Sequence, residues 1–392
     1  MNTNEQQAWE NLVSHVGEIE ALIGARGLME WDQQVNMPSG GAPTRGRISA
    51  VLSGICHDRM VDNQIGEWLQ ILEDGTLDDF HSAAVRNIQR DYKRAQQIPR
   101  DLVKALATAQ AQGFAAWMSA RQSGNFSDFA PSLKELLGLV KERIDILHTD
   151  EACRYDVLLD EFDPGTTSQW LDPVFSRLAG ELGTLLDTLD DQPAPSKLNH
   201  TFSVDGQKAL HAAVSAKLGF NYDQGRIDES EHPFTVGMGP GDIRITTRYF
   251  PEDLLEGLGG TIHETGHGLY EQGLPSDWFG TGVGRAASFG LHESQSRFWE
   301  NFIGRSLPFF QWMAPLVQEH CGVAVSPEAL FGAANRVERS LVRVAADEAT
   351  YNLHIIVRYQ IERALIDGDL TVAELPTAWN DTYEKIVGAR PT

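Results

Sequence analysis

The feature that most constrains this chain is the segment at residues 259–268, Gly-Gly-Thr-Ile-His-Glu-Thr-Gly-His-Gly. On an α-helix, residues four apart lie on one face and one turn from each other. His263 and His267 therefore present two imidazoles to a single point, with Glu264 beside them. Leucine and isoleucine recur around the segment at helical spacing, and a glycine and a proline follow it, so the sequence predicts a helix here.

This spacing is typical of helix-borne zinc peptidases, in which the two histidines bind the metal and the glutamate reaches a metal-bound water. The alternative is an ordinary helix with two satisfied histidines. A catalytic zinc takes a third protein ligand and leaves one position for water. Glu293, on the next predicted helix, is the best candidate for that ligand. Other glutamates also lie downstream, so spacing alone leaves the third ligand open.

Composition narrows the partners and the compartment. The 392 residues include 32 Lys and Arg against 55 Asp and Glu, a formal net charge of −23. A field of this sign repels nucleic acid and anionic membrane surfaces, so we expect neither as a partner. The sequence contains no apolar run of about 18 residues that would span a bilayer and no signal-peptide pattern at its N-terminus. Three cysteines without Cys-x-x-Cys spacing are typical of a reducing cytosol, so we expect a cytoplasmic protein.

Helical periodicity runs through most of the chain. The predicted helices include residues 6–23, 45–56, 66–72, 78–97, 101–120, 129–147, 289–303 and 334–366. The clearest strand signal lies at residues 242–249, where polar and apolar side chains alternate. Short stretches at 201–203 and 233–236 are its expected partners. We therefore predict a mainly α fold with one small β-sheet, outside the sandwich and Rossmann classes.

Four motifs occur in order along the chain: Asp242-x-Arg244-x-Thr246, His263-Glu264-x-x-His267, His292-Glu293-Ser294-x-Ser296 and Arg343-x-x-Ala346-Asp347. Together they resemble the signature set of the carboxypeptidase Taq family of metallocarboxypeptidases. The resemblance runs from about residue 28 to the C-terminus. Four ordered motifs make it far more specific than the two-histidine motif alone.

The resemblance implies a helical, groove-shaped metallopeptidase fold with the metal at the base of the groove and the small sheet beside the active site. It implies His263, His267 and Glu293 as ligands of one divalent ion, zinc or alternatively cobalt, and Glu264 as the general base. The expected reaction is removal of single residues from the C-terminus of short peptides, with broad specificity. We expect one catalytic domain over residues 1–392, with residues 1–100 as a helical N-terminal lid subregion, in a homodimer.

One departure from the family pattern keeps a second function open. The family continues beyond a segment like residues 388–391 into a Gly-x-x-Gln-Asp-x-His-Trp motif, whereas this sequence ends at Thr392. A catalytically inactive protein that binds metal and peptide is therefore an alternative. Another peptidase with the same helix, such as an aminopeptidase, is a further one, although the sequence lacks a Gly-x-Met-Glu-Asn-type motif.

Exopeptidase action requires a group that recognises the free C-terminal carboxylate, and the planar fork of arginine suits this role. Arg343 is the first candidate, and its alternative is a helical i,i+4 ion pair with Asp347.

The strand motif and one histidine supply the other candidate substrate residues. Asp242, Arg244 and Thr246 are expected to line a groove wall that limits substrate length; the alternative is a strand with a polar solvent face. His292 either supports the ligands, contacts substrate or is a surface histidine. The aromatic residues after Glu293, Phe298 and Phe302 among them, are expected in the core.

Overall fold

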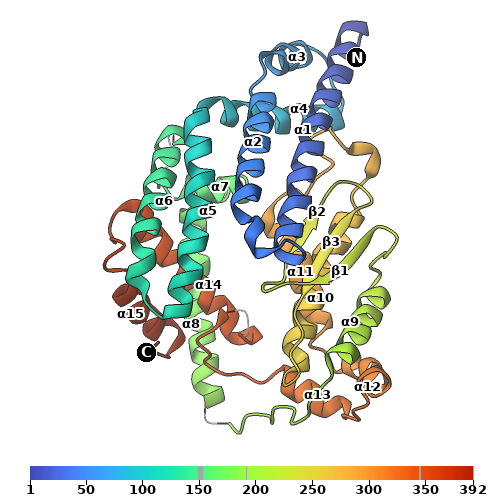
Figure 1. Ribbon diagram of the computed structural model, residues 1–392, viewed down its shortest axis with the longest axis vertical. Coiled ribbons are helices and arrows are strands. Elements are labelled where there is room, and N and C mark those ends of the chain that lie inside the picture. Colours follow the sequence, from blue (N-terminus) through green and yellow to red (C-terminus); the bar gives the residue numbers. More distant parts are fainter. Residues whose placement is uncertain (149–152, 191, 344–345, 392) are drawn as a thin grey trace. The chain divides into compact units, whose positions relative to one another are not determined.

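The computed structural model describes residues 1–148, 153–190, 192–343 and 346–391. It is mainly helical with one three-stranded sheet, which confirms the predicted fold class (Figure 1). The α-helices of the described residues are α1 (Thr3–Val35), α2 (Ala42–Met60), α3 (Asn63–Glu73), α4 (Asp79–Gln97), α5 (Arg100–Ser123), α6 (Phe126–Leu147), α7 (Asp156–Phe162), α8 (Ser168–Asp190), α9 (Val204–Leu218), α10 (Leu254–Gln272), α11 (Phe289–Arg297), α12 (Leu307–Cys321), α13 (Pro327–Ala334), α14 (Glu348–Asp367) and α15 (Leu375–Val387). None of these helices combines the length and apolar character needed to cross a membrane.

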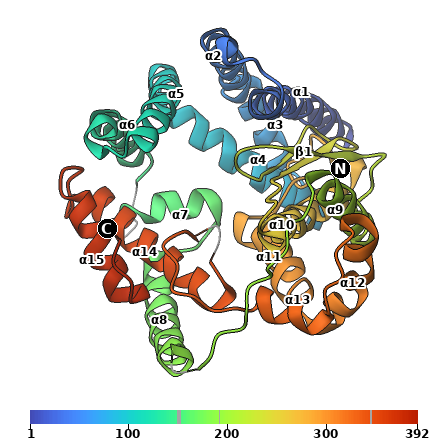
Figure 2. The same ribbon diagram turned by 60° about the horizontal axis from the view of Figure 1, so that its bottom comes forward.

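The chain divides into two compact units. The first comprises Met1–Ala111, Ser215–Arg248 and Gly260–Ser296, and the second comprises Gln112–Val214, Tyr249–Gly259 and Arg297–Thr392. In the first unit, α1 packs on α2 and α3 over a buried apolar cluster that includes Leu12 and Leu72. In the second, α8, α14 and α15 gather around a cluster that includes Leu353 and Tyr383 (Figure 2). The expectation of one catalytic domain with an N-terminal lid stays a prediction.

The first helix is longer than its sequence pattern predicts. Residues 6–23 were the expected helix, but α1 continues to Val35 and passes through Gly24 and Gly27. A Cβ atom at Gly24 would lie 2.1 Å from the carbonyl oxygen of Met238. These glycines lower helix propensity, but they let the backbone of α1 approach the β2 region closely. Tertiary packing therefore overrides the local helix-breaking signal.

The sheet has the order β1-β3-β2, formed by β1 (Gly225–Glu229), β2 (Thr235–Gly237) and β3 (Ile243–Thr247). The predicted strand at 242–249 and its partner near 233–236 are confirmed, because β2 pairs antiparallel with β3. The expected strand at 201–203 is wrong: there Phe202 is buried and its amide bonds to the Pro251 carbonyl. The parallel strand β1 takes that place in the sheet.

The sheet packs against α10, the helix that carries the two-histidine motif. The hydroxyls of Thr247 and Thr261 lie 2.7 Å apart and share a hydrogen bond. A Cβ at Gly268 would lie 3.3 Å from the side chain of Ile245, so the absence of a side chain there lets β3 approach the helix. The sheet thus fixes one side of α10 and leaves its histidine-bearing side for other contacts.

The predicted helix at 334–366 is wrong in its N-terminal part as far as the structure describes it; residues 344–345 of that prediction lie outside the described residues. Helix α13 ends at Ala334, and α14 begins only at Glu348. Asp347 has extended backbone, and its carboxylate accepts hydrogen bonds from the amides of Ala349 at 2.9 Å and Thr350 at 3.0 Å. An aspartate in this position starts a helix rather than continuing one.

Candidate metal centre

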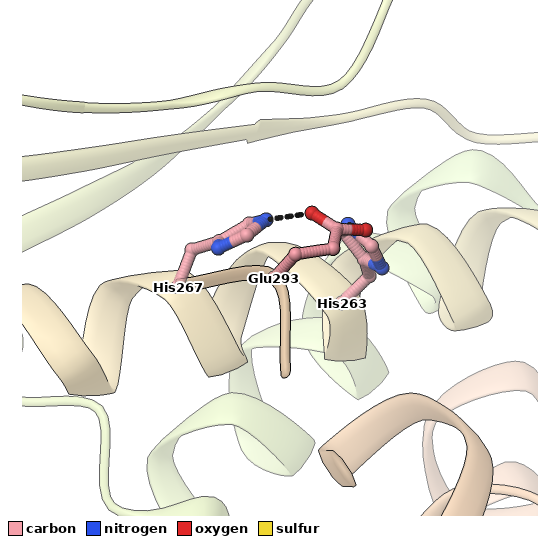
Figure 3. A group of neighbouring side chains, drawn as sticks. All are labelled: His263, His267 and Glu293. Atoms are coloured by element: carbon pink, nitrogen blue, oxygen red, sulfur yellow. Dashed lines mark ion pairs between the residues drawn. The ribbon is translucent and has the colours of Figure 1, made fainter. Parts of the chain in front are cut away.

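Helix α10 brings the two motif histidines together. Their rings lie 4.9 Å apart between centroids and at 81° to each other. Figure 3 shows both rings on one side of the helix, with the carboxylate of Glu293 between them. The Nε2 atom of His263 lies 3.5 Å from Glu293 Oε1, and that of His267 lies 3.2 Å from Glu293 Oε2. Two side chains from successive turns of α10 and one side chain from α11 therefore converge on one point.

A glycine on α10, Gly266, allows this convergence. Glu293 lies on α11, whose backbone passes close to Gly266. A Cβ at Gly266 would lie 2.6 Å from the Cα of Ser296 and 2.8 Å from the carbonyl oxygen of Gln295. Because backbone atoms cannot rotate away as a flexible side chain can, only glycine fits between the two histidines at this helix separation.

The three side chains fit a divalent ion. Their ligand atoms all lie within 4.8 Å of one another. Two ligands of a tetrahedral zinc ion, each bound at about 2.0–2.2 Å, lie roughly 3.3–3.6 Å apart. The two nitrogen–oxygen separations of 3.5 and 3.2 Å are close to this spacing. Two imidazoles and one carboxylate form a common donor set for catalytic zinc, although such ligands do not select one metal.

Glu264 is buried beside the histidines and is held by the sheet. Its Oε2 atom accepts a hydrogen bond of 2.6 Å from the hydroxyl of Thr235 on β2. The same hydroxyl lies 3.2 Å from the Glu264 carbonyl oxygen. Burial raises the pKa of the Glu264 carboxyl, an effect that the neighbouring His263 and the Thr235 hydrogen bond oppose. The sheet thereby fixes one oxygen of the carboxylate.

His292, a predicted site residue, lies against the ligands rather than on a bare surface. Its ring stacks on that of His267, with centroids 4.5 Å apart and an interplanar angle of 16°. Its Nε2 lies 2.8 Å from Oε1 of Glu271, and the ring of Tyr270 meets it edge-on. Glu271 was not predicted from the sequence as a site residue. The signal that would have found it is its spacing, four residues after His267 on the same helix face.

The strand motif shows two different environments. Arg244 donates two hydrogen bonds of 2.9 Å to the carboxylate of Asp242, and its guanidinium carbon lies 4.3 Å from the centroid of the Trp31 ring. Thr246, by contrast, is fully buried, and its hydroxyl bonds to Ser230 and to the backbone of Phe234. The alternative of a polar solvent face therefore does not hold at Thr246, because this hydroxyl links strand segments within the protein. Substrate contact by Asp242, Arg244 and Thr246 stays a prediction.

Arg343 lies in the second unit. Its Nη1 donates a hydrogen bond of 2.7 Å to the hydroxyl of Tyr351. The helical i,i+4 pair with Asp347 that was the alternative for this residue requires a helix through both positions, whereas Asp347 caps α14. The role of Arg343 in carboxylate recognition stays a prediction.

The aromatic residues that follow Glu293 correct another expectation. Phe298 and Phe302 were expected in the core, but their exposed fractions are 45% and 75%. They belong to a π-helical stretch, Phe298–Ile303, that continues α11. A π-helical turn shifts the side chains out of the 3.6-residue period, so a projection of the sequence onto a regular helix assigns them to the wrong face.

Comparison with known proteins identifies one family. The family model for the carboxypeptidase Taq (M32) metallopeptidases matches residues 11–392. Thermostable carboxypeptidase 1 of Thermus thermophilus is 39% identical over 403 residues, which cover 98% of this chain and 79% of that protein. Carboxypeptidase 1 of Bacillus subtilis is 33% identical, covering 100% of this chain and 79% of the relative. The crystal structure of the M32 carboxypeptidase from Deinococcus radiodurans superimposes with a TM-score of 0.90 at 33% identity, covering 98% of this chain and 78% of that one.

The helical fold and the cluster of two histidines and one glutamate, which could hold a metal ion, are features of a metallopeptidase. The chain belongs to the carboxypeptidase Taq (M32) metallopeptidase family, as the sequence motifs predicted. It is accordingly a metallocarboxypeptidase, a hydrolase of peptide bonds that depends on a divalent metal ion.

Proposed function

We propose that this protein removes the C-terminal residue from short peptides with broad specificity, using one divalent ion held by His263, His267 and Glu293. Zinc is the proposed ion, with cobalt as an alternative. The observation that carries the proposal is the convergence of these three side chains beside the buried Glu264. A cytoplasmic location and a homodimer stay predictions from the sequence.

The chain's own residues divide the chemistry between them. A divalent ion, when bound, supplies an electrophile that polarises the scissile carbonyl and acidifies water. Glu264 accepts the proton of the attacking water and delivers it to the leaving amine. The Thr235 hydroxyl holds Oε2 of that carboxylate at 2.6 Å, so the general base is oriented before substrate arrives. We propose that Arg343 recognises the free carboxylate of the substrate.

The test of this function compares three short peptides with metal-loaded protein. An N-blocked dipeptide with a free carboxylate should release its C-terminal amino acid, whereas its C-terminal amide should be cut far more slowly. Release from an unblocked peptide at its N-terminus would instead indicate an aminopeptidase. Folded, metal-loaded protein that cuts none of the three would indicate a protein that only binds metal and peptide.

Arg343 provides a separate prediction. Arg343→Ala should raise KM by about 10–100-fold and leave kcat within a fewfold, because a charge-assisted, bidentate contact to the carboxylate is lost in ground state and transition state alike. Arg343→Lys keeps the positive charge but loses the planar, bidentate guanidinium, so its KM should lie between the KM of the wild type and that of Arg343→Ala. Steady-state kinetics on the N-blocked dipeptide measure both constants. An unchanged KM in Arg343→Ala would remove this residue from carboxylate recognition.

A further inference from the structure

We propose that Glu271 and His292 form a positioning pair for the metal centre, in which His292 fixes the plane of the His267 ring and Glu271 fixes His292. The inference rests on the proposed metal site and adds two residues to it. Neither residue is a ligand in this account. Both act through His267 and through the backbone position of Glu293.

The pair lies on the same two helix faces as the ligands. Along α10, residues 263, 267 and 271 are each four apart, so Glu271 lies one turn beyond His267 on the same side of the helix. Along α11, His292 is the immediate neighbour of Glu293. Each helix therefore contributes ligand and support together: α10 carries His267 followed by Glu271, and α11 carries His292 followed by Glu293.

The second ring nitrogen of His267 bears on how its ring is oriented. Histidines that bind metal almost always donate their second ring nitrogen to a carboxylate, a carbonyl or water, which fixes the ring. The Nδ1 atom of His267 is buried and has no hydrogen-bond partner among the described residues. The side chain of His267 is only 12% exposed. Among the described residues, the contacts that bear on the plane of the His267 ring are therefore its packing contacts.

The stacked ring of His292 provides that contact. The two imidazoles are nearly parallel, at 16°, with their centroids 4.5 Å apart. This is the offset-stacked range of aromatic pairs. His292 is itself held at Nε2 by Glu271 at 2.8 Å and at its side by the Tyr270 ring, 5.1 Å away at 75°. A ring bound at one nitrogen and packed against two other rings has little rotational freedom, so it is a firm surface for His267.

The same contact ties the two helices together. The Glu271–His292 hydrogen bond bridges α10 to α11 one turn beyond the point where Gly266 lets their backbones meet. The side chains of Glu271 and His292 are 23% and 19% exposed, so the bond is largely shielded from water. Because His292 precedes Glu293 directly, anchoring His292 also fixes the backbone from which the ligand carboxylate extends.

The experiment measures metal binding to protein stripped of metal, independently of turnover. Competition with a chromophoric chelator gives the zinc dissociation constant for the wild type and for Glu271→Ala and His292→Ala. We expect it to rise 10–100-fold in each variant, the usual effect of removing a residue that supports a ligand. The absorption spectrum of the Co²⁺-loaded variants should also change in band position or intensity, because it reports ligand geometry.

Conservative variants separate positioning from folding. His292→Phe keeps a flat ring against His267, and Glu271→Gln keeps a hydrogen-bond acceptor, so both should bind zinc more tightly than the corresponding alanine variants. If an alanine variant fails to fold, the zinc affinities of His292→Phe and Glu271→Gln test the positioning pair instead. The control is His81→Ala, which removes the 2.7 Å pair between His81 and the Asp78 carboxylate at the N-terminus of α4 and should leave zinc affinity unchanged.

Different results would contradict the positioning pair and the proposed metal site. Zinc affinity and a Co²⁺ spectrum within twofold of wild type in both alanine variants would overturn the positioning pair. A wild-type protein that binds no zinc, or binds it equally well after Glu293→Ala, would instead overturn the proposed metal site on which the inference rests.

Discussion

Glu264→Gln is expected to lower kcat on the order of 10²–10⁴-fold while the protein still binds one metal ion with nearly wild-type affinity. Glutamine has the same shape as glutamate, and its carbonyl oxygen can still accept the 2.6 Å hydrogen bond from Thr235. It cannot accept the proton of the attacking water. Glu264 is not among the three residues whose ligand atoms converge, so metal affinity should be preserved.

Two measurements on the same sample check this result: metal content by atomic absorption, and release of the C-terminal amino acid from an N-blocked dipeptide. Thr235→Val is the informative companion, because it leaves the base in place and removes only the hydroxyl that orients it. Its kcat should fall less than that of Glu264→Gln. Retained turnover in metal-loaded Glu264→Gln would exclude Glu264 as the general base.

Gly266→Ala is expected to damage both folding and metal binding through a single methyl group. The new Cβ would lie 2.6 Å from the Cα of Ser296, so α10 and α11 must separate. Overpacking of this kind typically costs about 1–3 kcal/mol. The separation also moves Glu293 away from His263 and His267, so zinc affinity should fall by about tenfold or more, and each tenfold loss of affinity corresponds to about 1.4 kcal/mol.

The matched control is Gly138→Ala in α6, where a Cβ would meet nothing within 4 Å. That substitution should leave metal affinity unchanged and raise the free energy of unfolding by up to about 1 kcal/mol, because alanine favours the helix. Urea unfolding in the presence of EDTA measures stability without the metal contribution. Equal stability and equal zinc affinity in Gly266→Ala and wild type would contradict the close helix contact.

The sequence predicted most of the site because its parts follow local rules. The spacing of His263 and His267 places them on one helix face whatever surrounds them, and the ordered motifs identified Glu293. The strand at 242–249 showed the alternation of a half-buried strand. The helix and strand signals depend on residues close together in sequence, and Glu293 came from the order of the motifs along the chain, so neither needed knowledge of the packing.

The features that were missed depend on contacts between distant segments. Strand β1 carries charged residues and forms only because β3 pairs with it in parallel. Helix α1 passes through two glycines because Met238 lies against them. The start of α14 is an exception, because the Asp347 carboxylate caps it through local hydrogen bonds to the amides of Ala349 and Thr350. Glu271 acquires its partner only when α11 returns alongside α10.

The measurement that tests the central claim most directly is a titration of metal-free protein with Zn²⁺, in which bound metal and dipeptide cleavage are followed together. The proposed function predicts that both rise in parallel, reach a plateau at one ion per chain, and disappear on adding a chelator. Metal binding that saturates at one ion without release of the C-terminal amino acid would contradict it, as would cleavage that survives complete removal of the metal.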